Sequence, residues 1–356
     1  MFAPAKAAAA VAQFVRTKRH AWRLRVVASI KEITLKFFRA FGLVLMTQKS
    51  YRDMSYRRCA LLKAAKEVAE RSDGPSVRAV ECIVFSKDRP MQLHALLASY
   101  CEKVSGPALV HVLYLASNDR YERAYHDVMR VFDGRPVQFI RQTKFRDDLI
   151  GMLRRMRSSK VFFLVDDILF LENVDLADFA AVDPSVIIAS LRLGANLKKC
   201  YTLQRTQPLP PFIKRPVGKE KILWRWDDGR YDWAYPASVD GHLFATAEIL
   251  LITEVTSFNS PNTFEDALTS FSTCFQDRLG ACYPKSVIVN IPWNKVQSDN
   301  KNIHGRIHQE YLLEKWELGY QIDYRRFYGY VNQSAHEELD LLLVFRESER
   351  TCITSP

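Results

Sequence analysis

The stretch Lys160–Asn173, KVFFLVDDILFLEN, decides the fold of this chain. Its four apolar residues Phe162–Val165 predict a strand that is buried on both faces. The strand ends at two neighbouring acids, Asp166 and Asp167, and a second apolar run, Ile168–Leu171, follows at once. Acids in such a segment are costly to bury unless a cation or hydrogen-bond donors meet them. Either a divalent metal with a phosphate on its far side binds at this strand end, or the strand ends in a turn whose acids point to water.

The sequence on both sides of this stretch alternates between strand and helix patterns. Alternation at this spacing predicts βαβ units and a mostly parallel sheet flanked by helices, an α/β fold. We expect one such domain over residues 79–330, preceded by an extension (1–78) and followed by a C-terminal helix or tail (331–356). The predicted strands are 80–85, 110–116, 137–140, 186–191 and 286–291, and the predicted helices are 93–104, 121–132, 145–156, 249–256, 263–275 and 307–318.

Positive charge is concentrated in the N-terminal extension. The chain carries +11, and residues 1–78 hold 17 Lys and Arg against 5 Asp and Glu, which leaves the remainder at −1. A nearly neutral body does not favour nucleic-acid binding. Apolar residues recur at three- and four-residue steps over 22–46, with Lys and Arg elsewhere, which predicts a basic amphipathic helix. This helix either contacts an anionic membrane surface or packs on protein, and the break at Ser72–Pro75 marks the expected domain boundary.

The cysteines and the hydropathy bear on location. The seven cysteines form no C-x-x-C pair and no zinc-binding spacing, and Cys82 and Cys101 lie in apolar surroundings. This pattern predicts reduced thiols and a cytoplasmic compartment. No uncharged apolar run approaches the length that spans a membrane. We therefore expect a cytoplasmic protein, peripheral on the inner face of a membrane if residues 22–46 bind lipid.

Five motifs follow one another along the βαβ framework. They are FSKDRP (85–90), FLVDDILF (163–170), YPASVDGHLF (235–244), SPNTFED (260–266) and VNIPWNKVQ (289–297). Together, and in this order, they resemble the nucleotide-sugar-dependent glycosyltransferases of the GT-A fold, nearest to the bacterial members of family 2. The resemblance covers residues 79–330 and implies a GT-A-like domain.

The resemblance implies a nucleotide site at the end of the first strand. Ser86, Asp88 and Arg89 would line the base and ribose, with Asp88 as an acceptor and Arg89 as a donor toward phosphate. The alternative is a plain turn before a helix that has proline at its first position. Lys295 would offset the charge of the leaving diphosphate, and Arg192 and Lys198 are further candidates for that task.

The acid pair would be a shortened form of the family's metal motif. Asp167 would bind Mn²⁺ or Mg²⁺ directly, and Asp166 would meet the ribose or a metal-bound water. Val165 stands where many relatives have another acid. A metal with so few protein ligands completes its shell with substrate phosphates and water. His304 is a candidate extra ligand, and a solvated loop histidine is the alternative.

A second acid pair follows Ser260–Asn262, where a helix is expected to begin. By resemblance, Asp266 would be the base that takes a proton from the acceptor hydroxyl, with Glu265 as the second choice. The alternative is the ordinary enrichment of acids in a first helical turn. If the sugar is transferred with retention, the same acids would bind the acceptor instead.

The segment from Trp233 to His242 would form the acceptor platform. Trp233 and Tyr235 would stack on the sugar, and Asp240 and His242 would bind its hydroxyls, with Asn294 also in contact with substrate. The alternative is an aromatic loop that packs on the sheet. We expect at least one of Trp224, Trp226 and Trp233 at the site.

The leading hypothesis is a glycosyltransferase that uses a nucleotide-diphospho-sugar, UDP-sugar first, and a glycan or glycolipid acceptor, with metal assistance. One alternative is a sugar nucleotidyltransferase, although no glycine-rich phosphate loop follows the first strand. Another is a non-catalytic protein of the same fold that binds glycans or a membrane surface. Val165 in place of an acid supports this last alternative.

Overall fold

The computed structural model describes residues 48–72, 80–106, 108–217, 221–294 and 307–346. By its contacts the chain divides into two compact units, Met1–Tyr56 and Arg57–Pro356. Of the first unit only residues 48–56 are described, as the start of helix α2 (Gln48–Ser72). The predicted basic helix at 22–46 lies outside the described residues, and so do Lys295 and His304.

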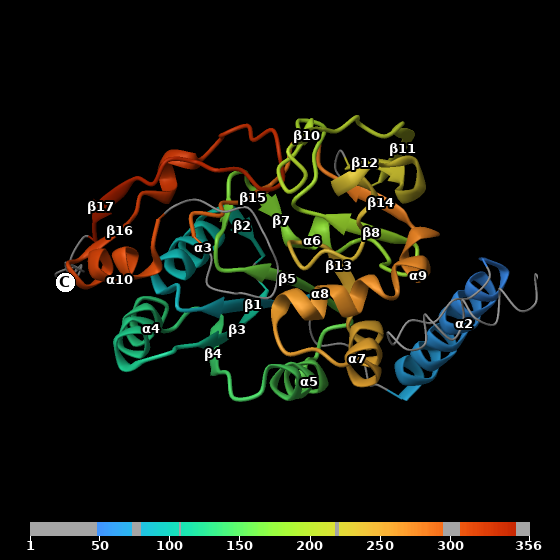
Figure 1. Cartoon of the computed structure of the whole chain (residues 1–356), viewed down its shortest axis with the longest axis horizontal. Helices are drawn as coiled ribbons and strands as arrows, with labels where there is room; N and C mark the ends of the chain where they lie inside the picture. The colour runs from blue at the N-terminus through green and yellow to red at the C-terminus, as the bar shows by residue number, and fades with distance from the viewer. Residues whose placement is uncertain (1–47, 73–79, 107, 218–220, 295–306, 347–356) are drawn as a thin grey trace, which may run out of the picture. The chain divides into compact units, whose positions relative to one another are not determined.

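A five-stranded sheet forms the centre of the second unit. Its strand order is β13-β5-β1-β3-β4, and all neighbours run parallel except β13, which is antiparallel to β5 (Figure 1). The fold is therefore α/β with a mostly parallel central sheet, as the alternating pattern predicts. The strands are β1 (Glu81–Lys87), β3 (Leu109–Leu115), β4 (Val137–Arg141), β5 (Lys160–Val165) and β13 (Leu243–Ala245).

The order of these strands creates a switch point beside β1. The chain proceeds from β1 to β3 and β4 on one side, and then returns to place β5 on the other side of β1. Phe85 of β1 is level with both Leu113 and Val165, so the carboxyl ends of the three strands lie at one edge. Open α/β sheets bind their ligands at this edge, at such a switch point.

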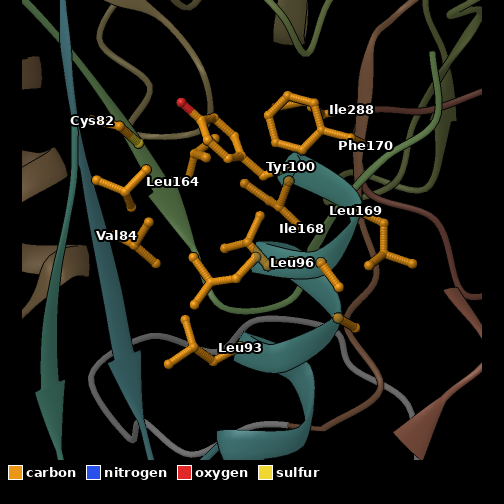
Figure 2. Packing of buried hydrophobic residues seen from close by; sticks show 14 of the residues in the cluster. Cys82, Val84, Leu93, Leu96, Tyr100, Leu164, Ile168, Leu169, Phe170 and Ile288 are labelled. Carbon is orange, nitrogen blue, oxygen red and sulfur yellow. The ribbon is translucent and has the colours of Figure 1, made fainter. Parts of the chain in front are cut away.

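Both faces of the sheet are covered by hydrophobic cores, and alternate residues of β1 point into one core or the other. Cys82 and Val84 join one hydrophobic cluster, whereas Ile83 and Phe85 join the other. Figure 2 shows the first cluster, where side chains of α3 fill the space between that helix and strands β1 and β5. The first cluster includes residues of α3 (Pro90–Lys103) and α4 (Asp119–Val131), and the second includes α5 (Phe145–Arg155), α7 (Thr246–Val255) and α8 (Pro261–Thr269).

Two segments that the pattern alone does not separate from the central sheet pair outside it, one in a four-stranded second sheet and one in a two-stranded ladder. The predicted strand at 186–191 forms β8 (Ile187–Ser190), which pairs with β14 rather than with the central sheet. Directly after the acid pair, β6 (Ile168–Phe170) pairs antiparallel with β15 (Ile288–Asn290). The second sheet has the order β11-β12-β14-β8, with β11 (Ile213–Val217), β12 (Lys221–Arg225) and β14 (Leu279–Cys282).

The remaining elements are short, and two of them differ from expectation. The helix expected over 263–275 is divided into α8 and α9 (Ser272–Gln276). The described part of 331–356 contains a strand, β17, and no helix. The other elements are β2 (Val104–Ser105), β7 (Val174–Asp175), α6 (Leu176–Phe179), β9 (Lys199–Cys200), β10 (Arg205–Thr206), η1 (Trp226–Asp228), η2 (Tyr231–Ala234), α10 (Gln309–Glu317), β16 (Tyr320–Ile322), η3 (Tyr324–Phe327) and β17 (Leu343–Phe345).

One cysteine pair corrects the expectation of reduced thiols. Cys59 of α2 and Cys274 of α9 are joined in a disulfide, with their Cα atoms 5.2 Å apart. Beside it, Arg58 Nη1 donates a hydrogen bond to Ser270 O at 2.6 Å. Among the described helices, none combines the length and the apolar character that a membrane crossing requires. The cytoplasmic location and the membrane contact stay predictions.

Candidate functional site

A cavity of about 730 Å³ opens at the carboxyl ends of β1 and β5. Residues from the ends of these two strands, the start of α8, the loop around η2 and the segment after β15 line it. Of the predicted site residues, the lining includes Ser86, Arg89, Asp166, Asp167, Tyr235, Asp240, Glu265, Asp266 and Asn294. The five motifs therefore converge on one cavity from distant parts of the sequence.

The guanidinium of Arg89 binds both members of the acid pair. Its Nη1 donates to Asp166 Oδ1 at 2.9 Å and to Asp167 Oδ2 at 2.8 Å. Its Nη2 donates to the backbone oxygen of Asn294. The second oxygen of Asp166 accepts from Lys87 N at 3.1 Å, so protein donors satisfy this carboxylate on both sides. Arg89 and both acids are buried, and the guanidinium offsets the charge of one of the two carboxylates.

Burial opposes ionisation of these acids even beside the arginine. Burial raises the pKa of Asp167 to about 6; Arg89 opposes the rise, whereas the charges of Asp166 and Asp240 add to it. The pKa of Asp166 is also raised by burial, against the lowering effect of Arg89. Burial lowers the pKa of Arg89, but the two carboxylates outweigh it, and the pKa is raised. The arginine therefore stays charged under all ordinary conditions.

The turn after β1 places Arg89 and removes Asp88 from the cavity. Asp88 has a φ of 53°, in the left-handed region that aspartate tolerates better than most residues. Its Oδ1 accepts from Ser117 N at 2.7 Å, so the carboxylate ties the turn to the end of β3. Asp88 is absent from the cavity lining, and its predicted place beside a nucleotide is not supported. Ser86 lines the cavity and shares a hydrogen bond of 2.7 Å with the Tyr125 hydroxyl.

Helix α8 carries the second acid pair into the cavity. Ser260 caps the helix in a capping box with Thr263, and Pro261 is its first residue. Glu265 and Asp266 come after the first turn, so acid enrichment in a first turn does not explain them. Glu265 Oε1 accepts from Val239 N at 3.0 Å.

Glu265 has the environment of a general base. Burial raises its pKa to about 7, and the charge of Asp240 adds to the rise, while Val239 N–H and Arg192 oppose it. A carboxylate with a pKa near neutrality both accepts and releases a proton readily. Asp266, the first choice from the sequence, is exposed. The geometry therefore favours Glu265 over Asp266.

Two residues expected on the acceptor platform lie in the core instead. Trp233 is fully buried, with its ring centre 4.9 Å from that of Trp224, and Trp224 Nε1 donates to Trp233 O at 3.1 Å. His242 is also fully buried, and its Nδ1 lies 3.1 Å from Pro236 O. Neither residue lines the cavity. The expectation of a tryptophan at the site is wrong, because Trp224, Trp226 and Trp233 are all buried, and the rings of Trp226 and Trp233 each pack edge-to-face against Trp224.

A glycine separates the residues that face the cavity from those that face the core. Gly241 has a φ of 73°, and a Cβ there would lie 2.7 Å from Ile288 Cδ1. The turn at this glycine leaves Asp240 in the cavity lining and His242 in the core. Tyr235, also in the lining, has its hydroxyl 3.0 Å from Thr269 Oγ1.

The sequence gives no signal for two further residues of the cavity. His336 Nε2 lies 3.3 Å from Asp240 Oδ2; burial lowers the pKa of His336, but Asp240 outweighs it and the pKa is raised. Asp232 accepts from Arg192 Nη2 at 2.9 Å, and Arg192 Nη1 donates to Ser238 Oγ at 2.6 Å. His336 belongs to the segment expected as a tail, outside every motif. Only long-range contacts place it.

The acid pair in this arrangement does not fit the expected divalent cation. Protein donors occupy both oxygens of Asp166 and one oxygen of Asp167, and of these four oxygens only Asp167 Oδ1 has no partner within the part of the chain that the structure describes. Mn²⁺ and Mg²⁺ need about six oxygen ligands in a regular shell. Within the described ranges, no three His, Cys, Asp or Glu side chains are grouped so as to hold a metal ion. The metal expected from the resemblance stays a prediction.

Comparisons with known proteins leave the family open. No protein-family model matches this chain, and no curated protein matches it in sequence. The resemblance to GT-A glycosyltransferases rests on the five motifs and stays an interpretation. The α/β fold and the cavity at its switch point rest on the structure alone.

Proposed function

We propose that this protein is a glycosyltransferase that moves a sugar from a nucleotide-diphospho-sugar to a hydroxyl of a glycan or glycolipid. One observation carries the proposal: a single cavity holds Arg89 with the acid pair at the strand ends and Glu265 on α8. The first group suits a phosphate-containing donor, and the second suits a hydroxyl that must lose a proton. A volume of about 730 Å³ is in the range of cavities that hold ligands of this size.

In the proposed reaction, Glu265 takes the proton of the acceptor hydroxyl. The oxygen of that hydroxyl bonds to the anomeric carbon of the donor sugar. The bond from that carbon to the phosphate oxygen breaks, and its electron pair leaves with the nucleoside diphosphate. Arg89 and Arg192 offset the charge that develops on the leaving group. Displacement in one step inverts the configuration at the anomeric carbon.

The test is turnover by the full chain with a panel of UDP-, GDP-, CDP- and ADP-sugars and glycan or glycolipid acceptors, followed as nucleoside diphosphate released. Glu265→Gln removes the base and keeps the shape, so we expect kcat to fall by about 10²–10⁴-fold. Glu314→Gln on α10 is the matched control, because Glu314 is exposed and outside the cavity. A Glu265→Gln variant with normal turnover contradicts the assignment. Absence of turnover with all donors favours the non-catalytic alternative.

A further inference from the structure

Arg89 occupies the carboxylate oxygens that the expected metal ion would need as ligands. The two carboxylate oxygens that it binds belong to Asp166 and Asp167, the residues expected to meet the ion. A divalent ion at these oxygens would have to displace the guanidinium. The displaced group would lose both ion pairs and its bond to Asn294 O, and a buried charge without a partner is strongly unfavourable.

Three hydrogen-bond donors of the cavity lining have no partner among the described residues. They are Arg89 Nε, Arg192 Nε and Asn294 Nδ2, and all three side chains are buried. Buried N–H groups in native proteins nearly always have an acceptor. A ligand with several closely spaced acceptor oxygens would satisfy such a set, and a diphosphate is the simplest one. The other buried polar atoms without partners, Asp167 Oδ1 aside, belong to residues outside the lining.

The remaining carboxylates of the cavity do not repel an anion as strongly as their number implies. Asp232 is paired with Arg192 and Asp240 with His336. Glu265, with a pKa of about 7, holds a proton for much of the time near neutrality. Asp266 is exposed, so water screens its charge. Arg89 and the unpaired donors are therefore available to an incoming diphosphate.

We infer that the cavity binds the diphosphate of its donor without a divalent metal ion, with Arg89 as the built-in cation. This inference rests on the proposed function and names how the donor is held. Arg89 stays between the two aspartates and offers Nε to a phosphate oxygen. Arg192 and Asn294 contribute the other donors. The acid pair serves to fix the arginine and keep it charged.

Calorimetric titration of the full-length protein with UDP, GDP, CDP and ADP tests the inference, each in EDTA and again in MnCl₂. We expect one nucleoside diphosphate to bind with Kd values that differ by less than tenfold between the two conditions. Binding that is tenfold or more tighter with Mn²⁺ overturns the inference and leaves the proposed function intact. Absence of binding in both conditions overturns the inference and the proposed function together.

Arg89→Gln sharpens the test, because it removes the cation and frees both aspartates. In EDTA we expect the Kd to rise at least tenfold, and MnCl₂ should restore part of the affinity, since the ion can now reach Asp166 and Asp167. Arg154→Gln is the matched control, an exposed arginine paired with Glu254 outside the cavity. A folded Arg89→Gln protein that binds in EDTA as tightly as wild type overturns the inference. If this variant does not fold, the wild-type comparison decides alone.

Discussion

Oδ2 of Asp240 lies 3.3 Å from Nε2 of His336, and this contact joins the C-terminal segment to the loop before β13. The partnership favours the charged form of both groups. It raises the pKa of His336, against the lowering effect of burial, and it helps to hold the pKa of Asp240 down, against the rise that burial causes. The contact therefore contributes to stability in a pH-dependent way.

Replacing His336 by Gln should expose that dependence. The pKa of His336 is higher in the folded protein than in the unfolded chain. The stabilisation by the contact with Asp240 is therefore fully present below the pKa of the unfolded histidine, and it is lost as the pH rises through the pKa of the folded one. We expect the variant to be about 1 kcal/mol less stable than wild type near pH 6, with the difference closing toward pH 9. Denaturant unfolding at several pH values measures it. His126→Gln, at an exposed histidine on α4 beside Glu122, is the control, and an equal pH-dependent loss there would contradict the prediction.

Glu265 should make turnover depend on pH around neutrality. Its pKa of about 7 means that the base form is lost as the pH falls, so kcat/KM should drop about tenfold per pH unit below that value. A pH–rate profile from 5.5 to 9 measures this. A profile that is flat between pH 5.5 and 7 would show that another group is the base.

The raised pKa of Glu265 also means that its ionised form, which the proposed reaction needs, destabilises the folded protein. The folded protein holds a proton on Glu265 that the unfolded chain has lost, so ionising this carboxyl above pH 7 destabilises the fold. Glu265→Gln should therefore be about 1–2 kcal/mol more stable than wild type at pH 8.5, after allowance for partial exposure. Near pH 4 the two proteins should be equally stable. Loss of stability at pH 8.5 would show that the bond to Val239 N outweighs the cost of the charge.

Trp233 should matter for stability and not directly for binding. It is fully buried against Trp224 and Phe212, so Trp233→Ala should cost about 3–5 kcal/mol, seen as a large fall in Tm. Tyr235→Phe, at a neighbouring cavity residue, removes one hydrogen bond to Thr269 and should cost about 1 kcal/mol. A Trp233→Ala protein of normal Tm that fails to bind sugar would return Trp233 to the acceptor site.

The Cys59–Cys274 bond should be visible without reductant. It closes a loop of 215 residues, and we expect its reduction to lower stability by about 2–4 kcal/mol. Thermal unfolding with and without dithiothreitol measures the loss, and peptide mapping of the unreduced protein identifies the pair. Cys274→Ser should abolish the effect of the reductant, whereas Cys101→Ser should leave it unchanged. If no cross-linked peptide is found, the expectation of reduced thiols holds.

The sequence predicts where the strands of this fold lie better than it predicts which strands pair with one another. The apolar run at 80–85 falls within β1 apart from one residue, and the acids at 166 and 167 directly follow β5. The run at 186–191 is equally apolar and forms a buried strand, yet it joins the second sheet. Burial determines the composition of a strand, whereas its neighbour depends on contacts between distant segments. Composition alone does not distinguish these cases.

The site could be predicted where motifs follow strands, and not where it depends on loops. Arg89 and the acid pair follow β1 and β5, whose carboxyl ends must meet in a parallel sheet. Trp233 and His242 lie in an aromatic loop, where the same residues suit either a sugar or a core. His336 is a single histidine outside every motif, and only its contact with Asp240 gives it meaning.

The attachment of the C-terminal segment to β15 has a consequence for how the protein is made. Asn290 N donates to Ala335 O at 3.0 Å, and Glu337 N donates to Asn290 O at 3.0 Å, which fixes His336 in the lining of the cavity. During synthesis the ribosome delivers β1, the acid pair and α8 first, and the cavity wall stays open until residue 336 has emerged. A nascent chain stalled before that point would carry most of the domain and no complete site, so ligand binding should appear late in translation and abruptly.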